Sequence, residues 1–162
     1  MTTEQSQPSN EGTTAVVSLI DALAMAIRRK DVDAVMSVFS PDVVSFDLGP
    51  PLRHGGGSAF EERWRALFDA YQGSIDFEPH DLRISASNDL AFSHSLNRMR
   101  GTTKSGVTTD RWSRWTACYR KTNGKWLIVH EQVSVPIDMK SGRALLELTP
   151  EAAGSPPQRA PG

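Results

Sequence analysis

The sequence predicts one α+β domain in which helices come first and a curved antiparallel sheet wraps around them. Up to about residue 71, apolar residues recur every three to four positions, which is the period of helices. From about residue 74 they follow the two-residue period of strands, with turn signals near residues 88, 105 and 123. A chain of 162 residues that is 38% hydrophobic is large enough for one core. The concave side of such a sheet, closed by helices, is a natural pocket.

Three helices are expected in the first half of the chain. Thr13 or Thr14 caps the first, whose apolar stripe runs from residue 16 to residue 27. Asp31 caps a second, short helix. Ser58 and Glu61 form a capping box for the third. The apolar face of this third helix consists of Phe60, Trp64, Leu67, Phe68 and Tyr71.

Five strands are expected. A short one from Val43 to Phe46 leads into Asp47, and a loop rich in glycine and proline follows. The other four form the antiparallel meander and span about residues 74–85, 90–102, 107–120 and 126–135.

The domain is expected to span residues 13–148. Residues 1–12 and 149–162 are rich in polar and small residues and proline, and they cannot bury enough apolar surface to offset the chain entropy that folding costs. We therefore expect disordered tails on both sides of the domain.

Charge and cysteine content exclude several classes of function. The 18 basic and 19 acidic side chains give a net charge of −1, which does not indicate a nucleic-acid or membrane partner. The single cysteine, Cys118, excludes an intramolecular disulfide and cysteine-rich zinc sites. The N-terminus lacks a signal-peptide pattern, and no apolar run has membrane-spanning length, so we expect a cytoplasmic protein.

No metal and no cofactor are expected. The four histidines are far apart and form no compact ligand motif. The glycine run at residues 55–57 precedes a helix, but it lacks the lysine and the spacing of phosphate-binding loops. We interpret this run as a flexible rim of the pocket.

Two segments resemble a known family. They are DVDAVMSVFSPDVVSFDLGPPLRHGG (residues 31–56) and GKWLIVHEQVSVP (residues 124–136), and they are similar to the SnoaL-like and ketosteroid-isomerase-like branch of the nuclear-transport-factor-2-like (NTF2-like) superfamily. The second segment also resembles the association domain of calcium/calmodulin-dependent protein kinase II. The resemblance covers about residues 15–137 and implies an NTF2-like cone, with three N-terminal helices packed in the concave face of the sheet. This superfold hosts isomerases, cyclases, dehydratases and non-catalytic proteins.

Asp47 matches the catalytic aspartate of ketosteroid isomerases, which is their general base. Partial burial beside Phe46 and Leu48 would suit a carboxylate that acts as a base near neutral pH. Alternatively, Asp47 caps the following loop by accepting bonds from backbone N–H groups. The resemblance places the two oxyanion donors of those isomerases at Leu23 and Thr116, neither of which is the expected residue type. This argues against steroid isomerase activity itself.

Strict alternation along the last strand places His130 and Gln132 on the same face as Trp126 and Ile128. Because the two large apolar side chains must pack against the helices, we expect His130 in the pocket. There it would exchange protons with Asp47, since histidine titrates near neutral pH. Alternatively, His130 is a buried structural residue.

The hairpin around residue 105 leaves two registers open, because a shift of one residue exchanges the faces of every side chain. In one register Trp112 and Arg114 face inward with Asn97; in the other, His94 faces inward. An inward Arg114 would favour a carboxylate-bearing ligand. Alternatively, the arginines of these strands pair with Asp110 and cover aromatic rings.

These observations favour a protein that binds a mostly apolar small molecule, either as a cofactor-free isomerase, cyclase or dehydratase or as a non-catalytic ligand-binding or assembly module. In the enzyme, Asp47 is the base and His130 its proton partner. A homodimer is expected through the sheet face that carries Glu131, Val133 and Val135. The residues expected to contact the ligand are Trp64, Asn97, Trp112, Arg114 and Gln132.

Overall fold

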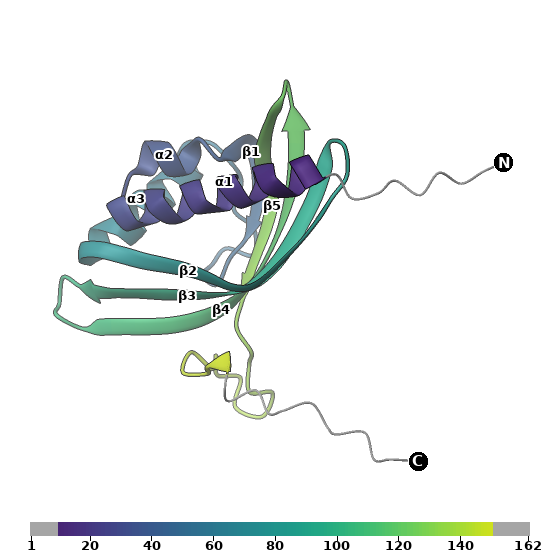
Figure 1. The fold of residues 1–162 in the computed structure, drawn as a ribbon. Coiled ribbons are helices and arrows are strands. Elements are labelled where there is room, and N and C mark those ends of the chain that lie inside the picture. The colour runs from purple at the N-terminus through teal and green to yellow at the C-terminus, as the bar shows by residue number, and fades with distance from the viewer. Residues whose placement is uncertain (1–9, 151–162) are drawn as a thin grey trace, which may run out of the picture.

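The computed structural model describes residues 10–150 and confirms the predicted α+β fold (Figure 1). Three helices and five strands follow one another in the expected order. Their bounds are α1 (Asn10–Arg29), α2 (Val32–Met36), β1 (Phe39–Phe46), α3 (Ser58–Ala70), β2 (Tyr71–Ala86), β3 (Leu90–Thr103), β4 (Thr108–Thr122) and β5 (Lys125–Ser134).

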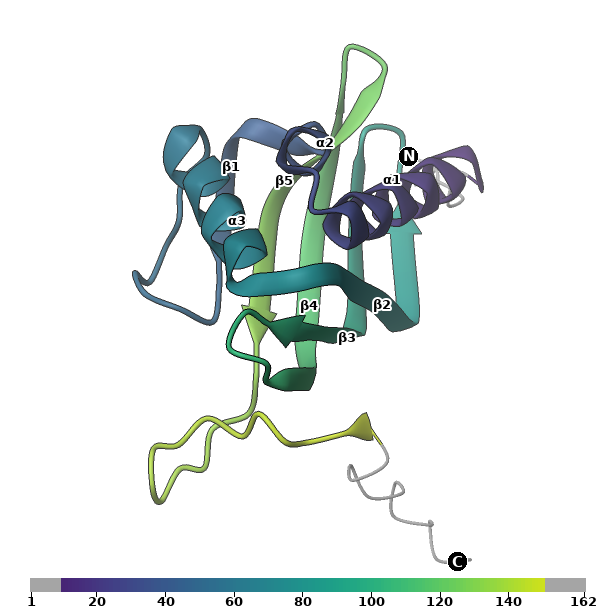
Figure 2. The ribbon, with the colours of Figure 1, turned by 90° about the vertical axis from the view of Figure 1, so that its left-hand side faces the viewer.

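The five strands form one curved sheet in the order β1-β5-β4-β3-β2. β1 runs parallel to β5, and every other neighbouring pair is antiparallel. Both ribbon views place α1 and α3 on the same, concave face of the sheet (Figure 1, Figure 2). The core fills the space between them, and its largest fully buried side chains are Ile20, Ile27, Phe60, Ile75, Tyr119 and Ile128.

The first helix is longer than predicted. α1 begins at Asn10, so Thr13 and Thr14 lie inside the helix and do not cap it. The predicted N-terminal tail therefore overlaps the helix at residues 10–12. The rest of that tail, residues 1–9, and residues 151–162 of the predicted C-terminal tail lie outside the described residues.

Of the caps predicted for the other two helices, one is confirmed and one is wrong. Asp31 caps α2 as predicted, because its carboxylate accepts a hydrogen bond from the Ala34 backbone N–H at 3.0 Å. At α3 the predicted capping box is wrong. Gly57 is the N-cap with a φ of 79°, a conformation that favours glycine, and Ser58 is already helical.

The last strand contains a β-bulge that changes which side chains face the core. Ile128 and His130 oppose consecutive residues of β4, so Val129 is an extra residue in β5. Before the bulge Ile128 is buried in the core, and after it Glu131 takes the inward face. The prediction that His130 and Gln132 face the pocket is therefore wrong, because the inserted residue reverses the alternation.

The inward faces of β3 and β4 also differ from those of both predicted registers. Asn97 lies opposite Ser113, and the two share the inward face. Trp112 and Arg114, one residue to either side of Ser113, therefore belong to the outer face. His94 lies on that outer face as well and is exposed. Thus Asn97 faces inward as predicted, while Arg114 does not accompany it.

Beyond β5, residues 136–150 run outside the sheet. Ile137 and Ala144 pair as an isolated bridge, and the carboxylate of Asp138 accepts bonds from the Lys140 backbone N–H and the Ser141 hydroxyl between them. The chain then brings Leu146 to the cavity described below. Within the described residues, no helix is long and apolar enough to cross a membrane.

Candidate ligand cavity

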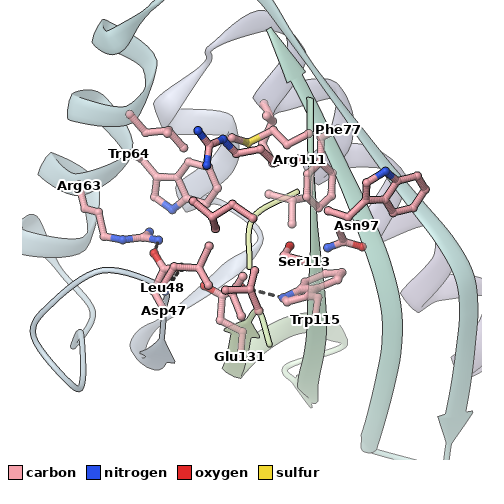
Figure 3. A pocket seen from close by; sticks show the side chains of 18 residues that line it. Asp47, Leu48, Arg63, Trp64, Phe77, Asn97, Arg111, Ser113, Trp115 and Glu131 are labelled. Atoms are coloured by element: carbon pink, nitrogen blue, oxygen red, sulfur yellow. Dashed lines mark hydrogen bonds and ion pairs between the residues drawn. The ribbon is translucent and has the colours of Figure 1, made fainter. Parts of the chain in front are cut away.

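A cavity of about 200 Å³ lies between α1, α3 and the concave face of the sheet (Figure 3). Most of its walls are aliphatic or aromatic side chains, including Trp64 of α3 and Trp115 of β4. An apolar lining with a few converging polar groups is typical of small-molecule sites. The polar side chains of the lining are Asp47, Arg63, Asn97, Arg111, Ser113 and Glu131.

Asp47 and Arg63 form an ion pair at one side of this cavity (Figure 3). Asp47 follows β1 directly, and Arg63 lies on α3 three residues after the buried Phe60, so both side chains point inward. The second carboxylate oxygen of Asp47 accepts a bond from the Leu48 backbone N–H at 2.7 Å. The Asp47 side chain is only 13% exposed and that of Arg63 25%. Asp47 thus caps the loop and also borders the cavity.

Two N–H groups of α3 beside the cavity have no partner. Arg63 Nη1 and Trp64 Nε1 are buried and make no hydrogen bond to any described residue. Burial lowers the pKa of the Arg63 guanidinium, and the charge of Glu131 partly opposes this. An unsatisfied buried donor costs about 1–3 kcal/mol, so both groups would gain from an acceptor.

Glu131 is a buried carboxylate whose two oxygens are both occupied. The Ser45 hydroxyl donates to Oε1 at 2.9 Å, and Trp115 Nε1 donates to Oε2 at 3.0 Å. The residue is 5% exposed. Charge-assisted bonds of this kind hold a buried anion in a fixed position. Glu131 is therefore a fixed negative charge near Arg63, and each of its oxygens already accepts one hydrogen bond.

Arg111 reaches the cavity from β4. It lies opposite Met99 and on the same face as Ser113 and Trp115. Its side chain is exposed, and no ion pair or hydrogen bond of its guanidinium is found among residues 10–150. Figure 3 shows it apart from the Asp47–Arg63 pair and from Glu131.

His130 lies on the opposite side of the sheet from Asp47. Its Nδ1 is 2.7 Å from the carbonyl oxygen of Val44, and its ring meets the Phe46 ring edge-on with centroids 4.8 Å apart. Val44 and Phe46 alternate along β1 with Ser45 and Asp47, so their side chains point away from the cavity. The alternative that His130 is structural agrees with these contacts.

The other predicted ligand contacts divide between the two faces. Trp64 and Asn97 line the cavity, whereas Arg114 and Gln132 lie on the outer face. Trp112 starts from the outer face and reaches the cavity rim.

The alternative that the arginines of these strands pair with Asp110 and cover aromatic rings is confirmed for Arg98. Its guanidinium bonds both carboxylate oxygens of Asp110, at 2.8 and 2.5 Å. It also lies over the Trp112 ring, with its central carbon 5.7 Å from the ring centroid.

The two positions that the resemblance assigns to oxyanion donors place no such donor in this cavity. Leu23 is an aliphatic wall of the cavity, and Thr116 lies on the outer face opposite His94. Among the described residues, no group of three or more histidine, cysteine or acidic side chains is placed to hold a metal ion.

Three charged residues of the cavity were absent from the predicted site: Arg63, Arg111 and Glu131. A signal existed for Arg63, because its spacing from Phe60 and Leu67 places it on the inner face of a helix. For Arg111 and Glu131 the sequence held no usable signal, since their faces depend on a strand register and on a bulge.

Fold and cavity together define an NTF2-like α+β cone. The SnoaL-like domain model matches residues 16–138, and the chain belongs to this family. No curated protein matches it.

Solved structures with the same fold include three informative ones. An NTF2-like protein of unknown function from Pseudomonas putida is 30% identical, with a TM-score of 0.80 over 89% of this chain and 100% of that one. A ketosteroid isomerase-like protein from Erwinia carotovora atroseptica is 24% identical, with a TM-score of 0.67 over 77% and 96% of the two chains. An NTF2-like superfamily protein from Salmonella enterica is 17% identical, with a TM-score of 0.72 over 85% and 99%.

Proposed function

We propose that this protein binds a mostly apolar small molecule in its cavity and acts on it by cofactor-free acid/base chemistry at Asp47. The observation that carries the proposal is the convergence of one carboxylate and two unpartnered N–H donors on an apolar cavity. Electrostatic interactions are stronger in such an enclosure than in water.

The chemistry that fits these groups is proton transfer next to a carbonyl. A ligand oxygen that accepts bonds from Arg63 Nη1 and Trp64 Nε1 would draw Arg63 toward it and loosen its pair with Asp47. Asp47 then takes a proton from the neighbouring carbon, and the electrons of the broken C–H bond move onto the carbonyl oxygen as an enolate. Returning the proton to another carbon completes an isomerisation, and returning it to a leaving hydroxyl completes a dehydration.

Deuterium exchange tests this proposal without knowledge of the natural substrate. In deuterium oxide the wild-type protein should accelerate exchange of the acidic α-hydrogens of tetralone, a bicyclic ketone, measured by proton NMR. Asp47→Asn should lower the protein-dependent rate by at least about 100-fold, because it removes the general base. Asp69→Asn, at an exposed position near the end of α3, is the control and should exchange at the wild-type rate. Unchanged exchange in Asp47→Asn would contradict the role of Asp47.

The second candidate is a non-catalytic ligand-binding protein. The ion pair of Asp47 with Arg63 favours it, because a carboxylate held by a guanidinium is a weaker base. This candidate predicts that tetralone or a similar ring compound quenches the fluorescence of Trp64 and Trp115 without any exchange above the buffer rate.

We also propose that the protein forms a homodimer, through a different face from the predicted one. Glu131, Val133 and Val135 line the cavity, so the prediction that they meet a partner is wrong. The outer face of the sheet carries large exposed apolar side chains, among them Leu90 and Phe92 of β3. Exposed apolar patches of this kind commonly mark protein–protein interfaces, because association removes their apolar surface from water.

A further inference from the structure

We propose that Arg111 selects ligands that carry a carboxylate on an apolar body. This inference rests on the ligand cavity proposed above and adds the chemical class of its occupant. It concerns recognition and not the proton transfer assigned to Asp47.

The backbone register directs Arg111 inward. Because Met99 pairs with Arg111 and Asn97 with Ser113, these four residues share the concave face of β3 and β4. Asp110 and Trp112, the chain neighbours of Arg111, face the other side, where Asp110 binds Arg98. The carboxylate nearest in sequence is therefore occupied and lies on the wrong face to neutralise Arg111.

The other charged side chains of the cavity already have partners, although those of Glu131 are neutral donors. Asp47 and Arg63 pair with each other, and both oxygens of Glu131 accept bonds from Ser45 and Trp115. Arg111 is the remaining charged side chain of the lining, and it has no partner within residues 10–150. The cavity thus offers a ligand one open positive charge.

The surroundings of Arg111 point to a carboxylate and an apolar ring or chain. A guanidinium presents paired N–H donors that match the two oxygens of a carboxylate. Trp64, Phe77 and Met99 form apolar walls in the same cavity. In a cavity of about 200 Å³ with mostly apolar walls, a singly charged head group loses less hydration than a phosphate.

Naphthoate and its neutral amide, naphthamide, test this assignment, because they differ almost only in charge. Their binding is followed by quenching of Trp64 and Trp115, which line the cavity. The wild-type protein should bind naphthoate at least about tenfold more tightly than naphthamide, as expected for a hydrogen-bonded ion pair. Arg111→Gln should abolish this preference by weakening the binding of naphthoate at least about tenfold, whereas Arg111→Lys should keep part of it.

Arg114→Gln is the matched control, since Arg114 lies three residues further along β4 on the outer face. It should retain the full preference for naphthoate. Equal binding of both probes by the wild type, or a preference that survives Arg111→Gln, would overturn the inference and leave the ligand cavity standing. Failure of the wild type to bind either probe or to exchange tetralone would overturn the proposed function as well.

Discussion

Glu131 organises the floor of the cavity through two hydrogen bonds to strands that are far apart in sequence. Ser45 belongs to β1 and Trp115 to β4, and β5 with Glu131 lies between them. The carboxylate therefore ties three adjacent strands together beneath the cavity. Its charge also favours the charged form of Arg63, which counteracts the effect of burial on the pKa of that guanidinium.

Removal of this carboxylate should destabilise the protein. Glu131→Ala leaves the buried Ser45 hydroxyl and the Trp115 indole N–H without an acceptor, so we expect a loss of about 2–4 kcal/mol in the free energy of unfolding. Glu131→Gln keeps one acceptor oxygen and should lose less. Urea unfolding of both variants and the wild type measures the difference. Equal stability of Glu131→Ala and the wild type would show that the two bonds contribute nothing.

The loop between β1 and α3 positions the Asp47–Arg63 pair. It folds back along β1, where the Ser45 and His54 backbones exchange two hydrogen bonds of 2.9 Å. Gly56 then passes so close to the preceding part of the chain that a Cβ there would lie 2.1 Å from the Pro41 carbonyl oxygen. The close approach requires glycine at this position, and it places the start of α3, and with it Arg63, next to β1.

A methyl group at this contact should displace the loop. Gly56→Ala should lower the free energy of unfolding by about 1–3 kcal/mol, because backbone atoms cannot move aside as a flexible side chain does. Gly55→Ala is the control, since a Cβ at Gly55 meets nothing within 4 Å. Thermal and urea unfolding compare the two. If they are equally stable, the close approach at Gly56 is not rigid.

At the scale of the whole molecule, the two faces of the sheet have different roles. The concave face holds the core and the cavity, and the outer face exposes apolar side chains of β3 beside polar ones such as His94 and Arg114. Phe92 is half exposed there although its strand, β3, has a neighbouring strand on each side. An apolar sheet face of this kind is suited to association with a second copy.

Light scattering tests the homodimer. At micromolar concentration the wild-type protein should have twice the mass of one chain, and Phe92→Asp should reduce it to one chain by placing a charge in the interface. Leu52→Asp is the control, because Leu52 is 98% exposed in the loop between β1 and α3 and is not part of the outer face of β3, and it should remain dimeric. A wild-type monomer would refute the dimer, and a dimeric Phe92→Asp would refute this face.

The sequence alone determined the fold class, the order of the elements and part of the site. Periodicity separates helices from strands because each has its own spacing of apolar residues, and the Asn123-Gly124 turn follows from the positive φ angles that these two residues adopt. Three predicted residues belong to this part of the site: Trp64 was assigned from helical periodicity, Asp47 from the family resemblance, and Asn97 from one of the two strand registers that the sequence left open. All three do line the cavity.

Only the tertiary structure decided which charged side chains face the cavity. Because of the bulge at Val129, Glu131 faces the cavity and His130 does not. Because of the register between β3 and β4, Arg111 faces the cavity and Arg114 does not. Strand side chains alternate with a period of two, so a shift of a single residue reverses a whole face. The residues around such a shift look the same in the sequence in either case. Pairing with the neighbouring strand decides which of the two faces points inward.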